Sequence, residues 1–143
     1  FNNGRFRSIY GWEYHCSSNS FRIKRKDNMA NTFKVVTKAG VTSADVIYTV
    51  AGSTTTVILG LILGNTTSAS INATVTLGTD TANRAGANNE TNQDVELLTT
   101  TPIPGNSSLE LLAGNKVVME TTDTLTVTGT GATDVVLSIM EIT

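Results

Sequence analysis

The stretch TTTVILGLILGNTTSASINATVTLG, residues 54–78, contains the strongest indication of the fold class. In its second part, SINATVTLG (70–78), apolar and polar side chains alternate, with the apolar set at Ile71, Ala73, Val75 and Leu77. A period of two residues is typical of a β-strand with one buried and one solvated face. Thr, Val and Ile also favour extended backbone, because branching at Cβ restricts χ1. The stretch therefore predicts strands rather than helices.

The first part, TTTVILGLILG (54–64), is the most apolar segment of the chain and departs from this alternation. Its large apolar side chains would cover both faces of a strand: Val57, Ile58, Leu59, Leu61, Ile62 and Leu63. Either other segments of the chain cover both faces, or one face meets a second subunit. A two-layer sandwich has no second cover, so we expect these six residues to include a subunit interface. Gly60 and Gly64 are residue types that often mark a bulge or a close backbone approach.

The rest of the chain after Met29 repeats the strand pattern on both sides of this stretch. Further strands are expected at 33–38, 45–51, 94–100, 108–121 (two strands joined at 113–115), 123–131 and 134–143. TPIPGNS (101–107) contains both prolines, which predicts an extended turn or an edge segment. Eight or nine short strands at intervals of about 8–12 residues indicate an all-β, antiparallel β-sandwich or jelly-roll-like fold.

A sharp change of composition falls at Met29. The residues before it carry six basic and two acidic side chains, whereas those from Met29 onward carry four basic and ten acidic ones. All 25 threonines follow Met29, and the Trp, His and Cys residues precede it. We therefore expect residues 1–28 to be an unrelated irregular leader, either disordered or upstream sequence foreign to the native protein, and 29–143 to be one domain. The basic run RIKRK (22–26) predicts nucleic-acid contact only if the leader is native.

Residues 78–93, GTDTANRAGANNETNQ, contain no apolar side chain larger than Ala and predict a long exposed loop. We expect this loop to display Asp80, Arg84, Asn89 and Glu90 outward. Its oxygen-bearing side chains raise the alternative of a Ca²⁺ site, which needs about 6–8 oxygen ligands. Their spacing does not match the known calcium-loop pattern, and the same residue types are ordinary turn formers, so an exposed loop is preferred.

From Met29 onward the chain has no His, Cys or Trp. This excludes Ser-His-Asp and Cys-His catalysis and zinc sites built on His or Cys in that region. Glu110, Glu120 and Glu141 leave an acid-pair enzyme conceivable, but their apolar neighbours predict that these carboxylates face solvent. We therefore expect no enzymatic activity, no cofactor and no metal. No apolar run approaches the ~18 residues of a membrane span, so no membrane partner is expected.

Four segments together resemble small virion structural proteins of tailed phages of marine bacteria: MANTFKVVTKAG, IYTVAGSTTTVILGLILGN, PIPGNSSLELLAGNKVVMETTDTLTV and the terminal SIMEIT. The resemblance covers nearly all of 29–143 and none of 1–28. It implies a non-enzymatic β-sandwich particle component in the capsid decoration, neck or tail, made in the bacterial host cytoplasm and located in the virion. Its expected partners are further copies of itself and other virion proteins, and it supplies no binding residues.

The alternative function is a carbohydrate-binding or adhesin-like recognition module. Such modules usually stack sugars on aromatic side chains. From Met29 onward the aromatic residues are Phe33 and Tyr48, which disfavours this alternative.

Overall fold

The computed structural model describes residues 30–79 and 93–143, which contain nine β-strands and no helix. The strands are β1 (Asn31–Val41), β2 (Asp45–Thr49), β3 (Thr55–Asn65), β4 (Ile71–Gly78), β5 (Val95–Ile103), β6 (Ser108–Leu111), β7 (Val117–Met119), β8 (Thr124–Gly129) and β9 (Thr133–Ile142). Every paired set of strands is antiparallel. The predicted all-β, antiparallel fold is confirmed.

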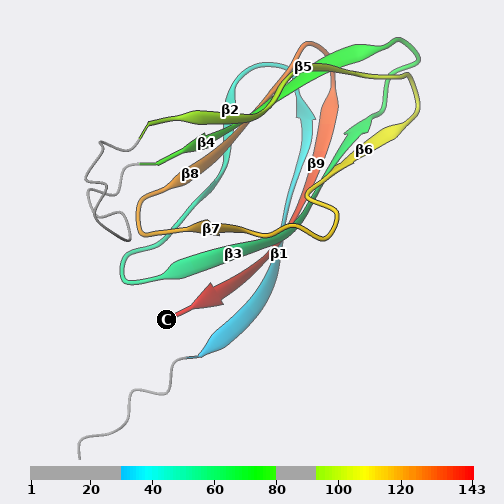
Figure 1. The fold of residues 1–143 in the computed structure, drawn as a ribbon. Coiled ribbons are helices and arrows are strands. Elements are labelled where there is room, and N and C mark those ends of the chain that lie inside the picture. Colours follow the sequence, from blue (N-terminus) through cyan, green and yellow to red (C-terminus); the bar gives the residue numbers. More distant parts are fainter. Residues whose placement is uncertain (1–29, 80–92) are drawn as a thin grey trace, which may run out of the picture.

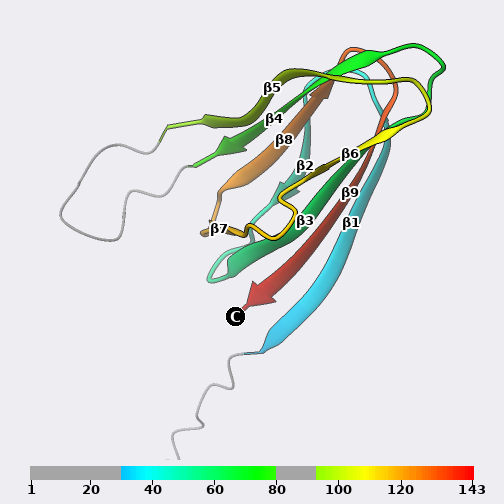
Figure 2. The same cartoon turned by 45° about the vertical axis from the view of Figure 1, so that its right-hand side comes forward.

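The strands form two sheets (Figures 1 and 2). Sheet A has the order β1-β9-β3-β6, with β7 also paired to β3, and sheet B has the order β2-β8-β4-β5. Because β6 and β7 pair with different parts of β3, they act as one interrupted strand. Counted in this way, eight strands form two four-stranded sheets, and consecutive strands lie in opposite sheets except for the paired β4 and β5, as in a jelly roll.

The core lies between the two sheets and is built from the inward positions of both. From sheet A it takes Ile58, Leu61, Leu63, Met119, Val135, Leu137 and Ile139. From sheet B it takes Ile47, Ile71, Ala73, Val75, Ile103, Leu125 and Val127. In β4 the buried and half-buried residues alternate as the sequence predicts.

A β-bulge in β3 determines which apolar residues of the 54–64 stretch reach this core. In the pairing of β3 with β9, Ile58 lies opposite Ile139 while Gly60 lies opposite Ser138, so Leu59 is an extra residue. A shift of one residue moves every later side chain to the other face of a sheet. The bulge therefore places Leu61 and Leu63 inward on the same side as Ile58. The expectation that Gly60 marks a bulge is confirmed.

The proline segment lies where a proline is tolerated. Strand β5 runs through Pro102, which pairs with Asn72 of β4. Because β5 is an edge strand of sheet B, the missing N–H of Pro102 interrupts no interior ladder. This agrees with the edge position predicted for 101–107.

Candidate functional site

The six residues predicted to include a subunit interface divide between the two faces of β3. Ile58, Leu61 and Leu63 are fully buried in the core of their own chain, so their burial needs no second subunit. Ile62 is 42% exposed, and Val57 and Leu59 are half-buried. The apolar character of the inward half is thus explained by sheet B, and subunit contact remains a prediction for the outward half.

The outward half of β3 belongs to an apolar surface that crosses sheet A. Phe33 lies opposite Met140, Met140 opposite Val57, and Val57 opposite Val118, so one row of apolar side chains crosses β1, β9, β3 and β7. Phe33 is 70% exposed and Val118 is 59% exposed. Further exposed apolar side chains of the same face are Val35, Ile62 and Val136. We call this set the outer face of sheet A.

The outer face of sheet B has a different composition. Its central strands present threonine at the positions between buried residues, and cross-strand pairs join Thr74 to Thr128 and Thr76 to Thr126. Threonine combines high strand propensity with a hydroxyl that water can solvate. The central strands of sheet B therefore carry a solvated threonine face, with the exposed Val46 on the neighbouring edge strand β2, whereas the apolar surface of sheet A crosses four strands.

Two of the predicted carboxylates are exposed and far apart. Glu110 of β6 pairs with Ile62, whereas Glu120 follows Met119, which pairs with Thr56 near the other end of β3. Six or seven residues of strand correspond to roughly 20 Å, well beyond the ~5–9.5 Å of glycosidase acid pairs. The structure does not bring Glu110 and Glu120 together. Their predicted solvent exposure is confirmed.

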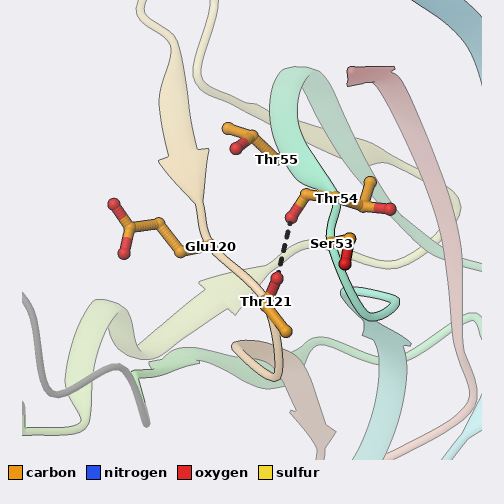
Figure 3. A pocket seen from close by; sticks show the side chains of 5 residues that line it. All are labelled: Ser53, Thr54, Thr55, Glu120 and Thr121. Carbon is orange, nitrogen blue, oxygen red and sulfur yellow. Dashed lines mark hydrogen bonds between the residues drawn. The ribbon is translucent and has the colours of Figure 1, made fainter. Parts of the chain in front are cut away.

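Glu120 also borders a shallow depression with Ser53, Thr54, Thr55 and Thr121 (Figure 3). The Thr121 hydroxyl donates to the Thr54 carbonyl at 3.3 Å, and the Glu120 carboxylate points away from both residues. The depression therefore presents hydroxyl groups without a converging acid or base. Its geometry is that of two neighbouring turns rather than of a catalytic cleft.

Glu141 contradicts its predicted solvent-facing position. Lys34 Nζ donates to Glu141 Oε2 at 2.5 Å, and the Tyr48 hydroxyl donates to Oε1 at 2.9 Å and lies 2.9 Å from Thr56 Oγ1. The Glu141 side chain is only 13% exposed, because it lies at the end of the sandwich against Tyr48 of sheet B. The strand period places Glu141 on the same face as the buried Ile139, two residues earlier. Only its contact with Tyr48, 93 residues away, depends on the packing of the two sheets.

We call the hydrogen-bonded group of Lys34, Glu141, Tyr48 and Thr56 the inner clamp, because it joins the two sheets. The hydrogen bond from Lys34, with a smaller contribution from Tyr48, lowers the pKa of Glu141. Burial is the main cause that raises the pKa of Tyr48. At neutral pH the carboxylate is thus charged and the phenol neutral, which favours a fixed hydrogen-bonded group over a proton-transfer pair.

The remaining sequence-based predictions concern metal ligands, a membrane span, the 78–93 loop, the leader and the two aromatic residues. Within residues 30–79 and 93–143, no three His, Cys, Asp or Glu side chains are grouped as metal ligands, and no helix is long and apolar enough to cross a membrane. The loop residues Asp80, Arg84, Asn89 and Glu90 and the whole leader fall outside the described ranges. Phe33 points outward from sheet A whereas Tyr48 joins the inner clamp, so they do not form a common stacking surface.

Comparison with known proteins adds little to this picture. No known protein family matches the chain, and no curated protein matches it significantly. A solved structure of the Bacillus endospore appendages, described as a novel family of disulfide-linked pili, matches with a TM-score of 0.44 and 14% sequence identity. That match covers 92% of this chain and 98% of the other chain. Similarity at this level is too low to support an argument about function.

Proposed function

We propose that this protein is a non-enzymatic structural subunit that assembles with copies of itself through the outer face of sheet A. The observation that carries the proposal is the contrast between the two outer faces of one sandwich. The central strands of sheet B present threonines, with Val46 as an exposed apolar residue beside them, whereas sheet A presents Phe33, Val35, Ile62 and Val118 together. Contiguous exposed apolar patches of this kind are typical of interaction surfaces.

The size of the outer face fits such a contact. Strands β1 and β3 contain 11 residues each. At about 3.3 Å per residue each is roughly 36 Å long, and four strands spaced by ~4.8 Å span about 19 Å. The whole outward side of the sheet, which also includes the exposed Glu110, thus measures about 700 Å². This is close to the ~800 Å² that each partner buries in a standard protein–protein interface.

The finer part of the proposal is that the assembly is a tailed-phage particle. It is supported by the resemblance of residues 29–143 to small virion structural proteins, which favours a position in the capsid decoration, neck or tail. Under this proposal the chain is made in the host cytoplasm and located in the virion. Neighbouring genes for portal, capsid or tail proteins, and peptides of this chain in purified particles, are the expected findings. Recovery of the chain from cells that carry no phage genes would contradict the virion proposal.

Self-assembly is tested by light scattering coupled to size-exclusion chromatography at micromolar concentration. We expect a mass above that of one 15.1 kDa chain, and a lower mass when Ile62→Thr and Val118→Thr are combined. Val46→Thr is the matched control, because Val46 is 54% exposed on the opposite sheet and undergoes the same substitution as Val118. A monomeric wild-type chain would refute the proposal. An equal loss of mass in Val46→Thr would refute the assignment of the outer face.

A further inference from the structure

Strand β1 exposes a long unpaired edge of sheet A. It pairs with β9 alone among the described strands, and its regular pairing runs from Asn31 to Lys38. Figures 1 and 2 both show β1 at the border of the sheet. An edge of this length is a template for a further strand unless proline, irregular pairing or short length blocks it.

The other edges of the two sheets carry such blocks. Strand β5 contains Pro102 and has register shifts in its pairing with β4. Strand β2 has five residues and a shift of its own, and β6 and β7 have four and three residues. Among the described strands, β1 is therefore the edge best suited to strand addition.

The hydrogen bonding of β1 shows which of its backbone groups face that edge. The Thr143 N–H donates to the Ala30 carbonyl at 3.4 Å, and the next pair along the register is Asn31 with Ile142. Directly opposed antiparallel residues alternate between hydrogen-bonded and non-bonded pairs. Even-numbered residues of β1 thus bond to β9. The N–H and C=O groups of Phe33, Val35 and Thr37 point to the free edge.

We infer that this edge pairs antiparallel with β1 of a second copy, with the two-fold axis at Val35; this rests on the proposed function and names the contact by which two subunits join. For both inner faces to lie on the same side, residues of equal parity must oppose each other. The axis must therefore pass through one residue of β1. The regular segment 31–38 overlaps most with itself when that residue is Lys34 or Val35.

The two lysines of β1 select between the possible registers. Lys34 and Lys38 lie on the inner side, at positions that would form non-bonded pairs, where opposed side chains are closest. An axis at Lys34 opposes Lys34 to itself, and an axis at Val36 opposes Lys34 to Lys38. An axis at Val35 instead places Lys34 opposite Val36 and Lys38 opposite Thr32. Like charges directly opposed are destabilising, so Val35 is favoured.

This register also joins the outer faces of the two sheets. Val35 lies opposite Val35 of the second copy, and Phe33 opposite Thr37. Three bonded pairs give about six main-chain hydrogen bonds across the edge. The apolar outer face then continues from one subunit into the next, which enlarges the surface available for the face contact proposed above.

The pairing is tested by cysteine cross-linking in the full chain. Cys16→Ser removes the single native thiol, and Phe33→Cys, Val35→Cys and Thr37→Cys are each introduced on this background. Opposed bonded residues have Cα atoms about 5.5 Å apart, within disulfide range. The two flanking positions are displaced by roughly 13 Å from their own copies. Mild oxidation should therefore give covalent dimers of Val35→Cys in large excess over the other two variants.

The outcomes separate this inference from the proposed function. Preferential cross-linking of Thr37→Cys or Phe33→Cys would overturn the register. An oligomeric wild-type chain with no cross-link at any position would overturn edge pairing and leave self-assembly standing. A monomeric wild-type chain would overturn both. Circular dichroism of each reduced variant confirms that it is folded, and all three sites are exposed in β1.

Discussion

Asn65 offers the sharpest test of how this sandwich is held together at one end. The residue is the last of β3 and is only 2% exposed. Its Nδ2 donates to the carbonyls of Ala69, Ile103 and Pro104 at 2.7, 2.9 and 3.1 Å. Its Oδ1 accepts from the backbone N–H and the hydroxyl of Thr67 at 2.9 and 2.7 Å. One side chain thus joins the β3–β4 loop to the β5–β6 turn.

The expected cost of Asn65→Ala follows from these bonds. The two Nδ2 hydrogens and the Oδ1 atom account for about four net hydrogen bonds, each contributing ~0.5–1.5 kcal/mol. The Ile103 and Pro104 carbonyls also accept from the Ser70 and Ser107 hydroxyls, which limits the penalty of leaving them unpaired. We expect the free energy of unfolding to fall by about 2–4 kcal/mol.

Urea denaturation followed by circular dichroism, at one fixed protein concentration, measures this change as a lower midpoint with an unchanged slope. Asn72→Ala is the control, because Asn72 lies half-buried on the outer face of sheet B and its truncation should cost less than ~0.5 kcal/mol. A loss below about 1 kcal/mol for Asn65→Ala, or equal losses for both variants, would show that the Asn65 hydrogen bonds do not stabilise this end of the sandwich.

Asn65→Asp separates hydrogen bonding from volume. The new carboxylate would face three carbonyl oxygens in a buried site, so its folded pKa should lie above the ordinary ~3.9. A carboxyl with a raised folded pKa binds more protons in the folded state, and stability is lost as pH rises through that range. The deficit of Asn65→Asp relative to the wild type should therefore increase from pH 4 to pH 7. A deficit that is constant over this range would contradict the expected charge effect.

Two further predictions concern the inner clamp and a close backbone contact. Lys34 lowers the pKa of Glu141 below its ordinary value of 4.5, so the stability that this carboxylate contributes is present above that value and is lost as pH falls below it. The difference in unfolding midpoint between the wild type and Glu141→Gln should therefore shrink from pH 6 to pH 3. A constant difference would count against the clamp. A Cβ at Gly105 would lie 2.2 Å from the Ser68 carbonyl oxygen, so Gly105→Ala should cost about 1–3 kcal/mol in thermal or urea unfolding. Gly60→Ala, whose Cβ meets nothing within 4 Å, should be neutral or stabilise by up to ~1 kcal/mol. If Gly105→Ala were instead the more stable of the two variants, the loop at Ser68 would move away from the added methyl group at no cost.

The predictable part of the fold is the part determined by local periodicity. Alternation in 70–78 correctly assigns Ile71, Ala73 and Val75 to the core, because a strand offers only two faces. The same rule fails for 54–64, where both faces are apolar and the phase of the pattern changes at the bulge. Only the pairing of β3 with β9 reveals that Leu61 and Leu63 share a face with Ile58.

The parts that could not be predicted depend on contacts between distant segments. The outward position predicted for Glu141 from its adjacent apolar residues is wrong, because the period of the strand places it on the inward face of Ile139. Its contact with Tyr48 depends on where the other sheet lies. Asn65 has no distinguishing pattern, and its role depends on where the β5–β6 turn lies. The outer face of sheet A could be predicted only in part. The sequence indicates excess apolar surface on β3, but the row from Phe33 to Val118 can be recognised only once the strand order is known.

Edge and face contacts on the same sheet have a geometric consequence for the assembly. Pairing about a two-fold axis at Val35 covers the free edge of β1 in both subunits. The two copies of sheet A then form one continuous sheet in the dimer. The apolar outer face of this dimer is still uncovered. If two dimers also pair face to face about a two-fold axis, edge contacts and face contacts with different axes alternate along the assembly. Such alternation continues into an extended array unless the axes close it into a ring. Variants should therefore stop at different stages: Ile62→Thr with Val118→Thr should leave edge-joined dimers that still cross-link through Val35→Cys. Monomers in that variant would show that the edge alone cannot hold two copies, and that the outer face is the primary contact.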